Sequence, residues 1–346
     1  MKSIRITVIA LIAIALVLLT AGCTQPSGTT TATPAATGAQ TPAPATPAPI
    51  KELVIGYQPS THQLAHFTAM DKGWWKEDLG PLGVANVSDK SFPTGAPEMA
   101  AMLGGDIDVA YVGAAPVLSA ISNGLDAKIV GAVQTQGSDL VVRSDLDYMG
   151  PESLKGLTIA TFPAGTIQDT VLRDWLKKNN ISADKDVTIK GMSPGDAVTA
   201  ITAGKVDAVF LPDPSPAVIV AQKKGKIVVH SGEMSPNHAC CVLVVSGKLI
   251  REHPEVVRQI LLTHQKATDY NIQHMDEAAE LYAKKTGANL GDVKSSMQIW
   301  DTKMVSDPNI IVDSVLAYAN TQYELKYLKA PLTKDQIFDL SFYKVP

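Results

Sequence analysis

Short apolar runs alternate with stretches of helical periodicity along most of this chain, and this alternation limits the folds open to it. A run such as 53–57 has the length of one buried strand, and a stretch with apolar residues at helical spacing follows it. The expected strands are 53–57, 84–92, 108–112, 128–133, 157–160, 187–189, 206–210, 227–230 and 241–245. The expected helices between them are 64–75, 97–103, 116–122, 166–178, 195–203 and 216–223. Strand, helix and strand in repetition predict an α/β fold, in which mostly parallel sheets are flanked by helices.

The pattern starts a second time near residue 157, which indicates two α/β lobes. A similar phrase occurs in each half, GGDIDVA at 104–110 and GKVDAV at 204–209. In both, a glycine suited to a left-handed helix end precedes an Asp and an apolar strand. Two ordinary helix–turn–strand units would give the same phrase, and this alternative stays open. After residue 245 helical patterns dominate, at 254–275, 276–285, 293–300 and 310–327.

The first 22 residues have the pattern of a secretory signal. Lys2 and Arg5 precede an uncharged apolar run over 6–19, and small residues then lead to Cys23. The run is shorter than the ~20 residues that a membrane-spanning helix needs, although an uncleaved N-terminal anchor is the alternative. Small residues before a lone Cys resemble a lipobox, with Thr20 where Leu is usual. This resemblance implies cleavage before Cys23, lipidation of its thiol and attachment to the outer face of the cell membrane.

The segment that follows Cys23 has the composition of a stalk. Residues 24–49 are all Thr, Ala, Pro, Gly, Ser or Gln, so they cannot bury enough apolar surface to offset the entropy of ordering them. Proline keeps such a segment extended. We therefore expect residues 23–50 to hold the folded part, from about residue 51, away from the membrane.

Charge and cysteine usage exclude several functions. Loss of Lys2 and Arg5 with the signal leaves 28 basic residues against 34 acidic ones, so the net charge changes from −4 to about −6. This mild acidity argues against a nucleic-acid partner. Apart from Cys23 the cysteines are the neighbours Cys240 and Cys241, which predict no structural disulfide. The seven histidines are scattered, so neither a metal site nor a cofactor is expected.

Several short sequence motifs, taken in order, resemble those of a known family. They are 55–57, 70–78, 104–110, 154–157, 165–166, 206–214 and 252–255. In their order and spacing the chain resembles the nitrate, sulfonate and taurine binding proteins and the thiamine-pyrimidine-precursor binding proteins of ABC importers, over nearly the whole folded part. The resemblance implies a two-lobed type II periplasmic-binding-protein fold. Lobe one would comprise 51–138 and 236–346 and lobe two 139–235, with crossings near 138–144 and 231–241 and the late helices returning to lobe one.

Loops at the carboxyl ends of the expected strands are the candidate ligand site, because open α/β sheets bind ligands at this edge. Helices begin at several of these loops, and their free N–H groups hold anions without a cationic side chain. The loops lack Lys and Arg, which favours a monoanion or a neutral polar ring. The candidate ligand-binding residues are Ser60, Thr61, His62, Thr94, Gly95, Ala96, Gly113, Ala114, Thr135, Ser138, Gly165, Thr166 and Asp213. Ser and Thr also cap helices and Asp213 also suits a turn, so the convergence of the loops carries the prediction.

The resemblance implies a monomeric solute-binding protein, not an enzyme. Its lobes would close around a small molecule and present it to the permease and ATPase subunits of an ABC importer. Two alternatives use the same fold: an enzyme similar to thiamine pyrimidine synthases, of whose cysteine cluster Cys240 and Cys241 are only a fragment, and a ligand-sensing ectodomain. The solute stays open among sulfonates, taurine, nitrate, bicarbonate and pyrimidine precursors.

Overall fold

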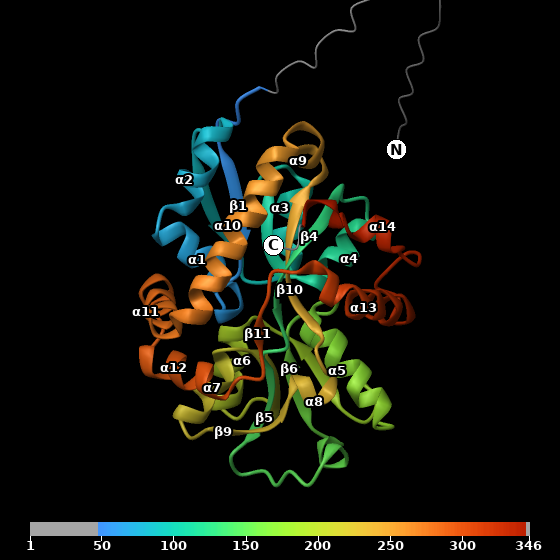
Figure 1. Cartoon of the computed structure of the whole chain (residues 1–346). Helices are drawn as coiled ribbons and strands as arrows, with labels where there is room; N and C mark the ends of the chain where they lie inside the picture. The colour runs from blue at the N-terminus through green and yellow to red at the C-terminus, as the bar shows by residue number, and fades with distance from the viewer. Residues whose placement is uncertain (1–47, 344–346) are drawn as a thin grey trace, which may run out of the picture. The chain divides into compact units, whose positions relative to one another are not determined.

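Two β-sheets organise residues 48–343, the part of the chain that the computed structural model describes (Figure 1). The first sheet has the strand order β11-β4-β10-β3-β1-β2. Its strands are β1 (Leu53–Tyr57), β2 (Val87–Ser91), β3 (Val109–Gly113), β4 (Ala127–Thr135), β10 (Ala239–Ser246) and β11 (Lys303–Met304). The second sheet has the order β7-β6-β8-β5-β9. Its strands are β5 (Ser138–Arg143), β6 (Thr158–Thr161), β7 (Thr188–Gly191), β8 (Ala208–Pro212) and β9 (Gly225–His230).

The N-terminal predictions lie outside the described residues. These are the signal over 1–22, the lipidated Cys23 and the stalk as far as residue 47.

Both sheets are mixed, whereas the sequence predicted mostly parallel sheets. The pairs β1–β2, β1–β3, β6–β7 and β6–β8 are parallel. Strand β10 lies antiparallel between β3 and β4, and β5 lies antiparallel between β8 and β9. The chain enters each of these two strands directly after it has crossed from the other sheet. A strand that arrives from the other sheet starts at the edge where its neighbours end, so it runs the opposite way.

Helices flank both sheets. Around the first sheet they are α1 (Leu64–Asp71), α2 (Trp74–Leu79), α3 (Gly95–Leu103) and α4 (Ala114–Ser122). Around the second they are α5 (Ile167–Lys178), α6 (Pro194–Thr202), α7 (Ser215–Ala221) and α8 (Ser231–Met234). The predicted helix over 64–75 is divided into α1 and α2, because Gly73 adopts a left-handed conformation (φ +71°) between them.

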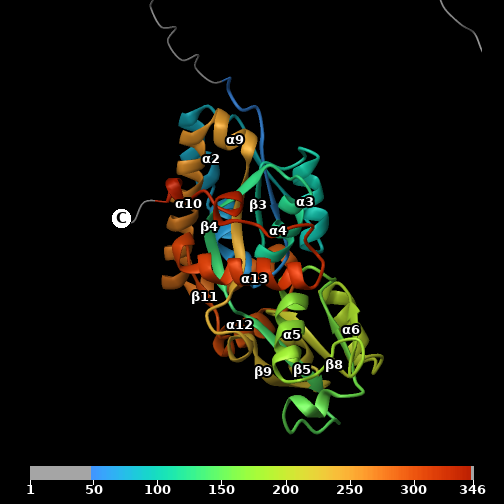
Figure 2. The ribbon, with the colours of Figure 1, turned by 90° about the vertical axis from the view of Figure 1, so that its right-hand side faces the viewer.

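Some of the C-terminal helices pack beside the first sheet and others contact the second. They are α9 (Gly247–Glu252), α10 (Pro254–Gln273), α11 (Met275–Thr286), α12 (Leu290–Ile299), α13 (Val312–Glu324) and α14 (Lys334–Ile337). Helices α10 and α11 pack on α1, beside the first sheet, as the resemblance implied. Helix α12 packs on α7 of the second sheet, and α13 contacts both α4 and α5 (Figure 2). The C-terminal third therefore touches both halves of the molecule.

Alternate residues of the second sheet enter two different hydrophobic clusters. On β5, Leu140 and Val142 belong to the larger cluster, which also contains the first-sheet core, while Val141 belongs to the smaller one. On β8, Phe210 and Val209 divide in the same way. Successive side chains of a strand point to opposite faces, so a sheet covered on both faces reads in sequence as a continuous apolar run.

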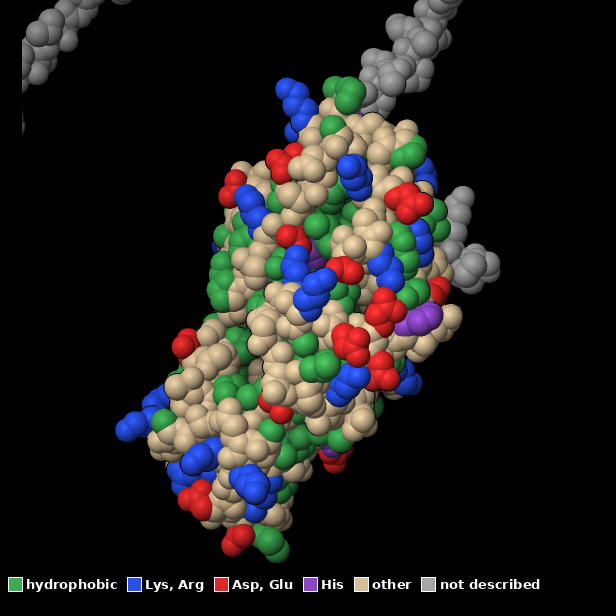
Figure 3. Space-filling model, turned by 90° about the vertical axis from the view of Figure 1, so that its left-hand side faces the viewer, with side chains coloured by type: hydrophobic (Ala, Val, Ile, Leu, Met, Phe, Trp, Pro, Cys, Tyr) green, Lys and Arg blue, Asp and Glu red, His purple; other side chains and the backbone are tan. Residues whose placement is uncertain are grey.

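Charges of both signs are interspersed on the molecular face shown in Figure 3. Lys72 pairs with Glu277, and Lys285 pairs with Asp89, both at 2.8–2.9 Å between nitrogen and oxygen. Surface pairs of this kind contribute little to stability. Among the described residues no helix combines the length and the apolar character that crossing a membrane requires.

A buried ion pair joins β5 to β9. Asp139 and His230 are paired in the register of these strands, and the two side chains lie 2.7 Å apart between Oδ1 and Nδ1. Asp139 is almost fully buried, whereas His230 is partly exposed. The hydrogen bond to Asp139 raises the pKa of His230 to about 9, against the opposing effect of burial.

We predict that stability falls as the pH rises through about 9, because His230 then loses its charge. A histidine whose pKa is raised on folding stabilises the protein fully below its unfolded value of about 6.5, and that contribution is lost above the folded value. Denaturation with urea should therefore show a decline in the free energy of unfolding over this pH window. In His230→Asn the decline should be smaller, while His274→Asn, at an exposed position, should behave as wild type. If the free energy of unfolding falls equally with pH in all three proteins, His230 is not the group responsible.

Candidate functional site

A cavity of about 450 Å³ lies between the two sheets, at the edge where their parallel strands end. On one side its walls come from the loops after β1 and β3, the turn before α3, the start of β10, and α11. On the other side they come from the loops after β6, β7 and β8 and the helices that follow these loops. Loops of both sheets therefore face one space, which is the arrangement of a ligand site in α/β proteins.

The structure brings about half of the predicted ligand-binding residues to this cavity. Those that line it are Ser60, His62, Gly95, Gly113, Thr166 and Asp213. Those that do not are Thr61, Thr94, Ala96, Ala114, Thr135, Ser138 and Gly165. Five residues of the second group are direct neighbours of lining residues in the chain, whereas Thr135 and Ser138 lie at the passage from β4 to β5, away from the lining residues in sequence. Ala96 is exposed, for example, and Thr135 is buried at the end of β4.

Several other residues that line the cavity were not among the predicted ligand-binding residues. They include Gln58, Gln63, Gln168, Cys240, Cys241 and Tyr282. Gln58 and Gln63 lie in the same loop as Ser60 and His62, so the position of this loop after a buried strand is the sequence signal that points to them. Tyr282 comes from α11, and its hydroxyl donates to the carbonyl of Pro59 at 2.9 Å. Nothing in the local sequence around Tyr282 indicates this contact.

Several helices begin at the cavity wall. Gly95 is the first residue of α3, Gly113 precedes α4, and Thr166 precedes α5. Ser193 precedes α6 and Ser215 begins α7. Helix N-termini carry partial positive charge and free N–H groups. No Lys or Arg occurs among the described residues that line the cavity, so the helix N-termini supply the positive potential there.

Asp213 is a fully buried carboxyl group in the cavity wall. Its Oδ1 accepts a hydrogen bond from Ser296 Oγ of α12 at 2.7 Å, and its Oδ2 has no partner among the described side chains and backbone. Burial raises the pKa of Asp213 to about 7, with a further rise from the nearby Asp139. Near neutral pH this group therefore carries only part of a negative charge.

Glu98 lies behind the wall, in the first turn of α3. It is fully buried, and its Oε2 accepts from the amide of Gln58 at 2.9 Å. Burial raises the pKa of Glu98 well above its usual range, which favours its neutral form. Glu98 orients the Gln58 amide at the cavity through this hydrogen bond.

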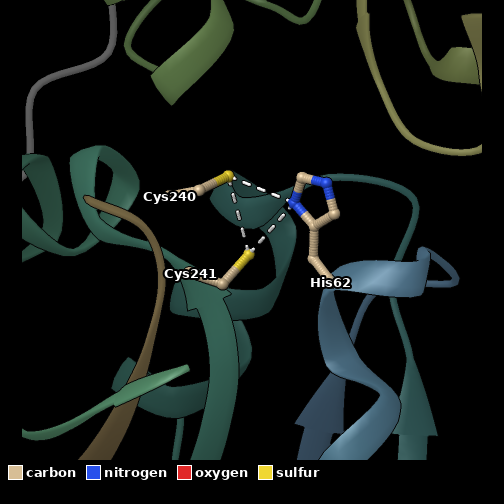
Figure 4. Close-up of side chains that lie close together, drawn as sticks. All are labelled: His62, Cys240 and Cys241. Carbon is tan, nitrogen blue, oxygen red and sulfur yellow. Dashed lines mark hydrogen bonds between the residues drawn. The ribbon is translucent and has the colours of Figure 1, made fainter. Parts of the chain in front are cut away.

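His62, Cys240 and Cys241 form a cluster at the wall (Figure 4). His62 Nδ1 lies 3.2 Å from Cys240 Sγ and 3.9 Å from Cys241 Sγ, and the two sulfur atoms are 3.9 Å apart. Both cysteines are free thiols and buried. Burial opposes a charge on His62, yet the hydrogen bond with Cys241 raises its pKa above the ordinary value. The pKa of Cys241 is lowered by its hydrogen bonds with Cys240 and His62.

An irregularity in β10 explains how two consecutive residues reach one histidine. In a regular strand, Cys240 and Cys241 would point to opposite faces. The register between β10 and β4 shifts on both sides of Cys241. Such a bulge re-aims side chains, and here it lets both sulfur atoms approach His62.

Gly137 holds the other side of the imidazole. Its carbonyl accepts from His62 Nε2 at 2.7 Å. Gln136 and Gly137 both have positive φ (57° and 82°), which makes the abrupt passage from β4 to β5. A Cβ atom on Gly137 would lie only 2.8 Å from His62 Nε2. The position therefore requires glycine both for its backbone and for contact with the ring.

Comparison with known proteins identifies relatives over most of the chain. The sequence model of the NMT1-like family matches residues 46–285. A Bacillus subtilis protein named for binding aliphatic sulfonates is 26% identical over 299 residues, which cover 85% of this chain and 88% of that protein. The nitrate/nitrite binding protein NrtA of a Nostoc species is 25% identical over 281 residues, which cover 73% of this chain and 62% of that protein. These relatives support a solute-binding role.

Solved structures share the fold. The alkanesulfonate-binding protein SsuA of Xanthomonas axonopodis pv. citri, bound to MOPS, aligns with a TM-score of 0.74 at 21% identity, over 84% of this chain and 99% of that one. The nitrate-binding protein NrtA of Synechocystis PCC 6803 also gives 0.74, at 16% identity, over 85% of this chain and 87% of that one. The predicted periplasmic-binding-protein fold is confirmed.

We predict that Gly137→Ala destabilises the protein more than a matched glycine substitution does. Gly287 also has positive φ (73°), but a Cβ atom there would meet nothing within 4 Å. Gly287→Ala should cost about 1 kcal/mol, the backbone strain alone, whereas Gly137→Ala should cost roughly twice that or more because it also displaces His62. Urea denaturation of the three proteins measures the difference. Equal losses would show that His62 does not depend on Gly137.

Proposed function

This chain belongs to the NMT1-like family, and we propose that it is an extracytoplasmic solute-binding protein of an ABC importer. It captures a small anionic or polar solute between lobe one (51–138 and 236–346) and lobe two (139–235). It then presents the solute to a permease with its ATPase. The protein acts as a monomer and performs no catalysis. Its relatives, which are named as binding proteins, support a binding role.

The observation that carries the proposal is the cavity between the sheets. Five helix N-termini meet there, and they can hold an anion without a cationic side chain. The remaining wall is largely apolar, with Phe162, Ile167, Val198 and Val218 on the side of the second sheet. A solute with an anionic head and a short apolar part, such as an aliphatic sulfonate, fits a cavity of helix N-termini and apolar side chains better than a bare inorganic ion does.

Hinge closure is the proposed mechanism of capture. The chain passes between the sheets at Gln136–Gly137 and again after α8, and the two passages lie side by side. Hydrogen bonds join them, because Gln136 N donates to the carbonyl of His238 at 3.0 Å and Asn237 N donates to Gln136 Oε1 at 2.6 Å. A solute that contacts loops of both sheets stabilises the closed arrangement by its higher affinity for that state.

Attachment to the membrane is proposed from the sequence. Export by the signal over 1–22 and lipidation of Cys23 place the folded part on the outer face of the cell membrane. Residues 23–50 would then connect the membrane to the folded part. A permease on the same membrane can meet a tethered binding protein at high effective concentration.

We predict that an aliphatic sulfonate raises the melting temperature of the purified protein. A ligand at a hundred times its Kd adds about 2.7 kcal/mol of stability, which corresponds to a rise of several degrees. Ethanesulfonate, taurine and nitrate are compared in thermal unfolding, with sodium chloride at equal ionic strength as the control. The absence of a dose-dependent rise with every anion would reject an anionic solute.

Asp213 makes the binding of such an anion depend on pH. As the pH rises through about 7, the carboxyl ionises and repels the anion, so the affinity of the wild type should fall. Asp213→Asn keeps the shape and the acceptor for Ser296, and its affinity should change little between about pH 6 and about pH 8. Asp147→Asn, at an exposed position, is the control. Calorimetric titration measures the affinity of each protein at the two pH values. If the affinities of wild type and Asp213→Asn depend on pH in the same way, Asp213 does not act on the bound anion.

A further inference from the structure

We propose that His62, Cys240 and Cys241 bind one thiophilic metal ion, of the class of Zn²⁺ or Cu⁺, in the wall of the cavity. The inference goes beyond the proposed function, because it depends on these three side chains and not on the class of solute.

The separations between the three ligand atoms suit a metal ion. Zinc binds sulfur at about 2.3 Å and imidazole nitrogen at about 2.0 Å, so tetrahedral ligand atoms lie roughly 3.5–3.8 Å apart. Here the three separations are 3.2, 3.9 and 3.9 Å. Adjustments of a few tenths of an ångström would bring all three atoms to bonding distance of one ion. The same sulfur separation is far longer than the bond of a disulfide, about 2.05 Å.

The orientation of His62 is that of a metal ligand. A carbonyl oxygen only accepts hydrogen bonds, so Nε2 carries a proton and donates it to Gly137. Nδ1 is therefore the ring nitrogen that faces the two sulfur atoms. Metal-bound histidines commonly donate their second N–H to a backbone carbonyl, which holds the ring in place. Binding of the ion would replace the protons between Nδ1 and the sulfur atoms.

The surroundings leave room for a fourth ligand. All three residues line the cavity, so the position that they leave open on a four-coordinate ion faces the solute space. The ion would thus take a water molecule or a donor atom of the solute as its fourth ligand.

The ligand set selects the metal. Thiolate sulfur and imidazole nitrogen are soft or intermediate ligands that prefer Zn²⁺ and Cu⁺, whereas Mg²⁺ and Ca²⁺ require oxygen. The bulge of β10 matters here, because it brings both thiols of a consecutive pair to one side of the strand.

The test uses the full chain, reduced and stripped of metal. Zn²⁺ is titrated against a coloured chelator, and Co²⁺ is added separately as a spectroscopic probe. We expect one Zn²⁺ per chain, and with Co²⁺ a strong thiolate-to-metal absorption together with the visible bands of tetrahedral cobalt. Sulfonate binding is measured in parallel on the metal-free protein, so that loss of the metal site and loss of the proposed function are distinguished.

Variants locate the ion. The double variant C240S/C241S and the variant His62→Asn should each lower the affinity for Zn²⁺ by about 100-fold or more. C23S removes the remaining cysteine and His274→Asn an exposed histidine, and both should bind as wild type. Circular dichroism checks that each variant folds, and the cobalt spectrum of the wild type stands independently of them. Zn²⁺ binding that survives C240S/C241S, or a cobalt spectrum without thiolate absorption in the folded wild type, would overturn the proposal.

Discussion

The hydrogen bond from His62 Nε2 to the carbonyl of Gly137 links the parts on which the site depends. It joins the loop after β1 to the point where the chain leaves the first sheet. The left-handed backbone at Gly137 lets β5 start at once, and the close packing of the ring excludes any side chain there. With Nε2 engaged, the other ring nitrogen faces β10, the strand on which the chain returns. One imidazole thus touches the outgoing passage, the returning strand and the cavity.

The electrostatics of the cavity follow from burial more than from charged side chains. Glu98 and Asp213 are acidic, yet burial raises the pKa of each, that of Asp213 to about 7, which favours their neutral forms. Helix N-termini then set the sign of the potential in a space that has no Lys or Arg among its described lining residues. An anionic solute, as proposed, would then be held by these helix N-termini although the chain has a net negative charge. Its binding would also depend on the charge state of Asp213.

Much of the architecture was predictable because it depends on local spacing. Apolar runs and helical periods located β1, β3, α5 and most other elements to within a few residues. The loop that contains Ser60 and His62 was assigned to the site for the same reason, since it follows a buried strand. Neighbours of lining residues, such as Thr61 and Ala96, do not line the cavity. Which way one residue of a loop points depends on contacts with segments that are distant in sequence.

By itself, the sequence determined the α/β class, the order of the elements and the family resemblance, because these reside in short-range patterns and in their succession. The tertiary structure alone decided the mixed direction of the sheets, since β5 and β10 are reversed only by the crossings between sheets. It also decided the meeting of His62 with Cys240, 178 residues away. From the sequence, the cysteine pair predicted only the absence of a structural disulfide. The register between β10 and β4 shifts on both sides of Cys241, and both sulfur atoms lie near the histidine.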